Sequence, residues 1–144
     1  MSTAVRQMIR GGVAGILAKI PQGLALYACR EIGLFLAMGV ALNVPLTILY
    51  SSKHVLLGAL FGAVFAVPVL KAWPNWVRGI LVGLVHAAAT LFYFNPFVDG
   101  VGFLGLEIGA LMPVVVVVAN LIWGMLAGAV VDLWGLFDRR APAQ

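Results

Sequence analysis

The chain has 144 residues, of which 63% are hydrophobic and only 10% are charged, and its mean hydropathy is +1.09. A soluble domain of this size does not need so much apolar residue, and the apolar residues come in blocks long enough to cross the hydrocarbon core of a bilayer. The formal net charge of +4 is spread over short loops and both ends of the chain, so it indicates membrane orientation rather than nucleic-acid binding. Composition therefore predicts a multi-pass, all-α integral membrane protein.

Motifs for catalysis and for metal binding are missing from the sequence. It contains no Gly-rich phosphate loop, no C-x-x-C, no H-E-x-x-H and no nucleophile with a matching base. The single cysteine, Cys29, excludes an intrachain disulfide. We therefore expect neither enzymatic activity, nor a metal site, nor a nucleic-acid partner.

The first predicted span, residues 8–29, carries a lysine and a proline near its middle, in the stretch GGVAGILAKIPQGLALYAC. Lys19 lies nine residues after Arg10, which is about 13 Å along a helix. A charged side chain at such a depth costs roughly 2.5–3.5 kcal/mol on insertion scales, so it usually faces protein or water. Because Lys19 also continues a row of glycines spaced four apart, we expect it to point into a helix seam.

The next block, residues 32–50, decides the number of spans. If it crossed the membrane, the basic residues would be divided nearly evenly between the two sides or would favour the wrong one. If it does not cross, Arg6, Arg10, Lys71, Arg78, Arg139 and Arg140 lie in the cytoplasm and only Arg30 and Lys53 lie outside. This arrangement fits the positive-inside rule, and Pro45 would break a helix in the block. We therefore expect residues 30–54 to form an interfacial or re-entrant helical segment on the outer face.

Four spans then make a transmembrane helix bundle, with both termini in the cytoplasm of a bacterium and the bundle in its inner membrane. The predicted spans are residues 8–29, 55–71, 77–95 and 110–137, and an outer loop covers residues 96–109. The whole chain, residues 1–144, is expected to be a single transmembrane domain.

Every predicted span carries a G-x-x-x-G pattern. Lipid tails give helices no hydrophobic reason to associate, so close approach of backbones through small residues has to supply the packing. The glycines predicted to pack helices are Gly11, Gly15, Gly23, Gly58, Gly62, Gly79, Gly83, Gly124 and Gly128. The pattern predicts a compact bundle with tight helix crossings and no wide permanent channel.

Two spans share a longer phrase: His54-x-x-x-Gly-x-x-x-Gly in the second and Asn120-x-x-x-Gly-x-x-x-Gly in the fourth. The phrases indicate an internal repeat. Together with the short G-x-x-x-G spans, they make the chain resemble small bacterial inner-membrane proteins of the YagU-like kind, although Asn120 stands where a second histidine is expected. The resemblance implies a multi-span bundle and no particular chemistry.

Several polar residues fall within the predicted spans, namely Lys19, Gln22, His86, Asn120 and, near the cytoplasmic edge, Asp132. One interpretation is a buried polar cluster that relays protons or binds a small polar group such as a quinone ring or an anion. The other is structural: Lys19 pairs with Asp132 or snorkels, while His86 and Asn120 bond neighbouring helices. We prefer the structural interpretation, because one chain supplies too few ionisable groups for a complete proton pathway. Asp99 and Glu107 are expected to be solvated charges of the outer loop.

The function expected from these features is that of a small accessory subunit packed against a larger bacterial membrane complex of energy metabolism. Its expected partners are the lipid bilayer and larger membrane subunits. One alternative is a small homo-oligomeric transporter or proton-linked carrier that uses the polar cluster. A second is a haem- or chlorophyll-binding subunit, with His86 as the axial ligand.

Overall fold

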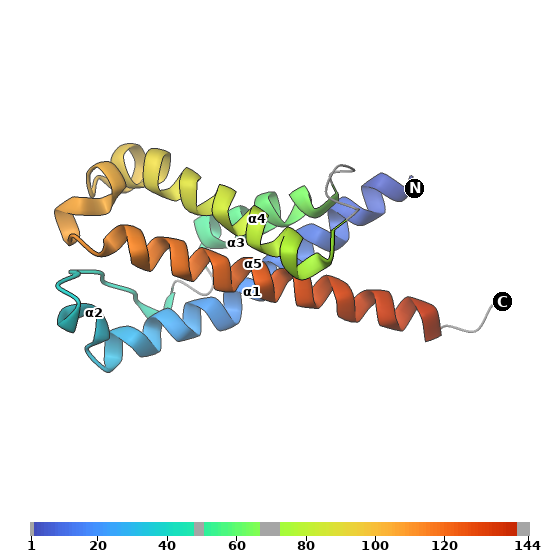
Figure 1. Ribbon diagram of the computed structural model, residues 1–144, viewed down its shortest axis with the longest axis horizontal. Helices are drawn as coiled ribbons and strands as arrows, with labels where there is room; N and C mark the ends of the chain where they lie inside the picture. The colour runs from blue at the N-terminus through green and yellow to red at the C-terminus, as the bar shows by residue number, and fades with distance from the viewer. Residues whose placement is uncertain (1, 48–50, 67–72, 141–144) are drawn as a thin grey trace.

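The computed structural model describes residues 2–47, 51–66 and 73–140, and all regular structure in these ranges is helical (Figure 1). The elements in chain order are α1 (Thr3–Glu31), α2 (Leu34–Ala37), α3 (Ser52–Ala63), η2 (Val64–Ala66), α4 (Asn75–Ala89), η4 (Thr90–Asp99), η5 (Phe103–Ile108) and α5 (Met112–Arg140). Three helical stretches are long and apolar enough to cross a membrane: Thr3–Glu31, Asn75–Asp99 and Met112–Gly135. The prediction of an all-α membrane protein is confirmed at this level.

The predicted second span is described only in its first part. Helix α3 has 12 residues and continues into the short 3₁₀ turn η2. The rest of the span, residues 67–71, lies outside the described residues, and so does Lys71 of the topology argument. The length of α3 alone therefore does not establish a fourth crossing.

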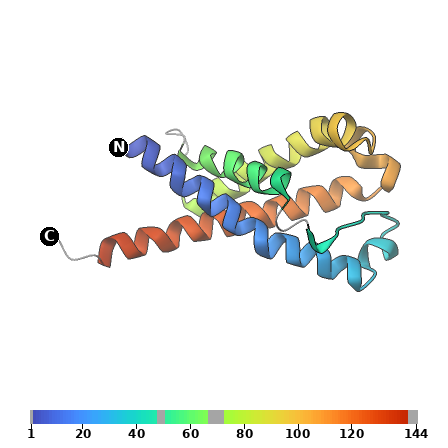
Figure 2. The ribbon, with the colours of Figure 1, turned by 180° about the vertical axis from the view of Figure 1, so that it is seen from behind.

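The long helices form two antiparallel pairs, α1 with α3 and α4 with α5, and α1 also packs against α5. The two views of the ribbon show α1 and α4 running one way along the molecule and α3 and α5 running the other (Figures 1 and 2). The N-terminus and the end of α5 lie at one end of the bundle, while α2, η4 and η5 lie at the opposite end (Figure 1). We call these the terminal end and the far end.

Glycines line the seam within each pair. A Cβ built on Gly58 of α3 would lie 2.9 Å from the carbonyl oxygen of Gly15 in α1, and one on Gly79 of α4 would lie 2.7 Å from the carbonyl carbon of Gly124 in α5. Neither position can hold a side chain at this backbone separation. The remaining seam contacts join Gly11 to Gly62, Gly83 to Asn120 and Gly128 to Asn75. Gly23 is buried in α1. The glycines of the G-x-x-x-G patterns thus lie in the seams within the two helix pairs.

The two pairs share short sequence patterns and equivalent glycine contacts. The pattern V-x-G-I-L occurs at residues 13–17 in α1 and 77–81 in α4, and the pattern G-x-L-x-G-A-V occurs at 58–64 in α3 and 124–130 in α5. Equivalent positions also make equivalent contacts, since the Gly15–Gly58 approach corresponds to Gly79–Gly124 and the Gly11–Gly62 approach to Asn75–Gly128. The internal repeat suggested by two spans therefore extends over four helices. Under this alignment Lys19 corresponds to Gly83, Gln22 to His86 and His54 to Asn120.

The segment after α1 folds back over the far end of the bundle. Its one helix, α2, has four residues, and Phe35, Val40 and Val44 are buried against Leu91 and Met112 of the second pair. The amide of Ala41 donates to the carbonyl of Ile108, 2.6 Å away, so the segment also bonds the turn before α5. These three apolar residues are covered by the chain itself, whereas Ile32, Leu34, Leu36 and Leu46 are exposed.

The predicted outer loop, residues 96–109, is largely helical. Helix α4 continues through η4, whose wider π-type turns extend past Pro96 to Asp99, and η5 follows after Gly100 and Gly102 have reversed the chain in the left-handed region. Proline has no N–H to donate, so the regular i to i−4 pattern cannot pass through Pro96. The helical stretch that begins at Asn75 thus runs four residues past residue 95, where the third span was predicted to end.

Candidate functional site

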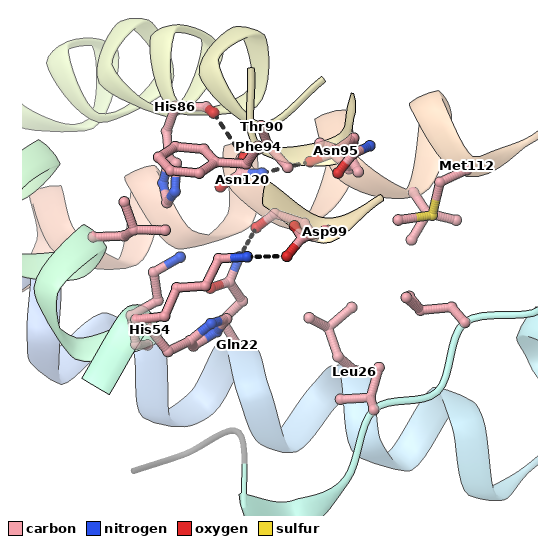
Figure 3. Close-up of a pocket in the computed structure, with 18 of the residues that line it drawn as sticks. Gln22, Leu26, His54, His86, Thr90, Phe94, Asn95, Asp99, Met112 and Asn120 are labelled. Carbon is pink, nitrogen blue, oxygen red and sulfur yellow. Dashed lines mark hydrogen bonds and ion pairs between the residues drawn. The ribbon is translucent and has the colours of Figure 1, made fainter. Parts of the chain in front are cut away.

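A cavity of about 260 Å³ lies between the two helix pairs, in the half of the bundle towards the far end. Figure 3 shows labelled side chains of α1, α3, η4 and α5 around this space, with His86 of α4 at its edge. Four of the five predicted cluster residues line the cavity: Lys19, Gln22, His86 and Asn120. Lys19 and Gln22 come from α1, His86 from α4 and Asn120 from α5. The structure therefore brings together residues from distant parts of the sequence.

Lys19 is the buried cation of this cavity, and its side chain is only 4% exposed. Its Nζ lies 4.9 Å from the centre of the Trp123 ring, and the indole N–H of Trp123 donates to the carbonyl of Gly15 at 2.9 Å. The missing side chain of Gly58 leaves room for the lysine stem, because a Cβ there would lie 3.0 Å from Lys19 Cγ. Within the described ranges, Lys19 forms no ion pair with a carboxylate. The contact that its Nζ makes in the described part of the chain is the cation–π contact with Trp123.

The predicted pair between Lys19 and Asp132 is wrong. Asp132 is exposed near the terminal end of α5, where its carboxylate accepts a hydrogen bond of 2.6 Å from the amide of Asn75. Asn75 in turn accepts one of 2.6 Å from Arg78. The seam between α4 and α5 sets Asn75 against Gly128 and hence beside Asp132, whereas α1 meets α5 at Trp123, more than two helical turns away along α5. Asp132 therefore does not belong to the polar cluster.

His86 is enclosed by aromatic rings. Its ring stacks on Phe61 with 4.2 Å between centroids and meets the edge of Trp123 at 4.9 Å, and the residue is 2% exposed. An axial ligand needs open space in front of its nitrogen for a macrocycle, and here the neighbouring positions are filled by Phe61 and Trp123. The described residues around His86 therefore do not fit a haem or chlorophyll.

Amide side chains line the cavity wall formed by α1 and α5. Gln22 donates from Nε2 to the carbonyl of Ala119 at 2.7 Å, and Asn120 donates from Nδ2 to the carbonyl of Val116 at 2.9 Å. These bonds use the amide nitrogens and leave Gln22 Oε1 and Asn120 Oδ1 without a partner in the described structure. The site thus presents acceptors as well as the Lys19 ammonium.

Unmet hydrogen-bonding capacity is concentrated at this cavity. Five buried polar atoms of cavity residues have no partner within the described ranges: Gln22 Oε1, His54 Nε2, His86 Nδ1, Asn95 Nδ2 and Asn120 Oδ1. A buried polar group left without a partner costs about 1–3 kcal/mol. Water molecules or a polar solute in the cavity would supply the hydrogen-bond partners that these five atoms lack.

The mouth of the cavity holds an ion pair that joins the two helix pairs. Lys53 of α3 bonds Asp99 of η4, and both side chains are partly exposed. Asp99 is exposed, as expected of a loop charge, and it also pairs with Lys53, which the sequence did not predict. Glu107 is exposed as well, as expected. Since Asp99 is matched by Lys53, the remaining charge of the cavity lining is the positive charge of Lys19.

The sequence interpretation missed His54 and Asn95. His54 was named only in the phrase of the second span, and its equivalence to Asn120 in the repeat is matched by its position in the same cavity. Asn95, the last residue of the predicted third span, is brought to the cavity wall by the π-type turns of η4. The repeat was a usable signal for the first residue, while no sequence pattern marked the second.

An apolar plug closes the cavity towards the terminal end. It consists of Ala18, Phe65, Val82, Trp123 and Ala127, all buried. Beyond it lies a second polar hollow of about 240 Å³, whose lining includes Gln7, Arg10, Asn75 and Arg78. The bundle therefore has one polar hollow at each end and a packed centre between them.

Among the described residues, no group of three or more His, Cys, Asp or Glu side chains is placed to hold a metal ion. Comparisons with protein-family models, with curated proteins and with solved structures found no match to this chain.

Proposed function

We propose that this protein is a small membrane carrier that binds an anionic group in the cavity between its two helix pairs. The observation that carries the proposal is the convergence of five unpartnered buried polar atoms on a space whose uncompensated charge is Lys19. A buried ammonium without a carboxylate partner is stabilised by any anion that reaches it.

Two features of the architecture support a carrier rather than a static binding protein. Transporters built from internal repeats bind their substrates at the repeat interface, and parallel repeats are related by an axis along the membrane normal. Here both pairs run the same way along the bundle, and the cavity lies between them (Figure 1). The polar hollows on the two sides of the Trp123 plug are the openings that alternating access needs.

The test uses methanesulfonate, a permanently charged anion that does not cross lipid unaided. Uptake of the labelled ion into proteoliposomes should exceed uptake into empty liposomes, and the Lys19→Met variant should lose the difference. The control variant is Arg6→Met, which removes a cation from an exposed position of the same helix and should retain uptake. Equal uptake by the Lys19→Met and wild-type proteins would refute the role of Lys19.

We also propose the finer topology: four crossings, both termini cytoplasmic, and location in the bacterial inner membrane. Its support is that α3 lies beside α1 over its described length and that Arg6, Arg10 and Arg78 lie towards the terminal end. Fusions of green fluorescent protein and of alkaline phosphatase to the C-terminus test the orientation. Fluorescence without phosphatase activity is expected, and the opposite result would contradict the topology.

An accessory role in a larger complex remains a second proposal. It is supported by the exposed apolar row of α1, which includes Leu17, Ile20 and Leu24 and which either lipid or a larger subunit can cover. The protein should then co-purify with larger membrane subunits in mild detergent. Isolation as a monodisperse lone species that carries out its own flux would contradict this role.

A further inference from the structure

An apolar groove adjoins the polar cavity on the surface between α1 and α5. It has a volume of about 180 Å³, and its lining includes Ala25, Leu26, Phe35, Val118 and Ile122. Leu26, Val115 and Ala119 line both the groove and the polar cavity, so the two hollows share a wall.

Gln22 stands at this shared wall and also lines both hollows. Its amide nitrogen bonds the carbonyl of Ala119 across the gap between α1 and α5, while its oxygen has no partner among the described residues. Figure 3 shows Gln22 and Leu26 following one another along α1 at the edge of the polar space. The Gln22 side chain therefore separates the groove from the cavity, and its hydrogen bond to Ala119 has to open for a ligand to occupy both.

The groove faces the surface that a bilayer would cover. Val118 and Ile122 on the α5 side and Ala25 on the α1 side are exposed, as is Leu24 beside them. The cavity on the other side of Gln22 is lined by Lys19, which lies three residues before Gln22 and hence on the same side of α1. The apolar lining of the groove and the basic side chain of the cavity therefore lie within about one helical turn of each other along α1.

We propose that the ligand of the cavity is a single-chain anionic amphiphile that comes from the bilayer between α1 and α5. Its small anionic head lies against Lys19 and His54, and its hydrocarbon tail lies in the groove on the other side of Gln22. Charge complementarity selects an anionic head, and the groove, which is lined by apolar side chains on both walls, selects a tail. The proposal rests on the proposed function, because it requires that the cavity bind an anionic group.

The test measures binding by fluorescence of Trp123, whose ring touches both Lys19 and His86. A variant in which Trp73, Trp76 and Trp134 are replaced by Phe reports from this residue alone. The protein is held in nanodiscs, and methanesulfonate, hexanesulfonate and decanesulfonate are titrated with correction for partition into empty nanodiscs. Decyltrimethylammonium serves as the cationic control.

Affinity should rise about fourfold for each methylene that enters the groove, and the cationic amphiphile should not bind. Ala25→Phe fills the groove and should weaken decanesulfonate by more than tenfold while leaving methanesulfonate unchanged. Ala28→Phe is the matched control, since Ala28 is an exposed alanine of α1 that lines neither hollow. Lys19→Met should weaken every sulfonate.

The failures are distinguishable. The amphiphile proposal is refuted if methanesulfonate binding depends on Lys19 but decanesulfonate binds no more tightly than methanesulfonate. It is also refuted if Ala25→Phe and Ala28→Phe change the affinity for decanesulfonate equally. In both cases the proposal that the cavity binds an anion is retained. If no sulfonate depends on Lys19, the proposed function falls as well. Circular dichroism of each variant in nanodiscs excludes loss of the fold as the cause.

Discussion

The most direct test of the architecture is to place a methyl group in the seam between α4 and α5. In Gly79→Ala the new Cβ would lie 2.7 Å from the carbonyl carbon of Gly124 and 3.1 Å from the amide nitrogen of Met125. Both atoms belong to the backbone, so no side-chain rotation can relieve the contact. Since carbon atoms pack best at about 3.5–4.0 Å, the two helices must separate by roughly 1 Å over the seam.

The expected loss of stability is the difference between two effects. Overpacking of this kind costs about 1–3 kcal/mol, while alanine gains up to about 1 kcal/mol over glycine in a helix. We expect a net destabilisation of about 1 kcal/mol. Gly135→Ala provides the matched control, because a Cβ there has no heavy atom within 4 Å. That variant should be as stable as the wild type or up to about 1 kcal/mol more stable.

The assay is reversible unfolding of the purified protein in mixed micelles, followed by circular dichroism as the denaturing detergent is increased. Gly79→Ala should unfold at a lower detergent fraction than the wild type, and Gly135→Ala should not. If Gly79→Ala unfolds within roughly 0.5 kcal/mol of the wild type, the seam is not close-packed and the pairing of α4 with α5 through glycine is refuted.

Three further tests examine the cavity and its surroundings. Gly58→Ala should lose about 1 kcal/mol of stability in the same assay and should also weaken methanesulfonate binding, because its methyl group would crowd the stem of Lys19, 3.0 Å away; unchanged binding would argue against this contact. Trp123→Phe removes the donor to the carbonyl of Gly15 and should destabilise the protein by about 1–3 kcal/mol; wild-type stability would mean that this bond contributes nothing. Lys19→Met and Asp132→Asn should have additive effects on stability to within about 0.5 kcal/mol, since the two residues do not touch, and rescue of the first by the second would restore the rejected pair.

The glycine rows show how far local sequence information reached. A G-x-x-x-G pattern predicts that one face of a helix carries no side chains and can approach another backbone closely. This property depends on the residues of that helix alone. The eight glycines of the four patterns all lie at close backbone contacts, as expected. The patterns did not state which helices would meet, because every such face is compatible with every other.

Lys19 and Asp132 illustrate the consequence for the site. The sequence placed both residues on glycine rows of antiparallel helices, which made a pair reasonable. The structure joins α4 rather than α1 to that part of α5, so Asn75 takes the place beside Asp132 and Lys19 reaches Trp123 instead. Because α1 meets α5 at Trp123 and not at Asp132, the ring of Trp123 is the partner of Lys19.

The sequence by itself determined the apolar helices, their close-packed faces and the presence of Lys19, Gln22, His86 and Asn120 within predicted spans, because hydropathy and residue size act along a single helix. Only the tertiary structure decided which helices pair, which side chains share the cavity, and that His54 and Asn95 belong to it. The physical reason is that a cavity is formed by the crossing points and turn geometry of several helices, and these depend on contacts between distant parts of the chain.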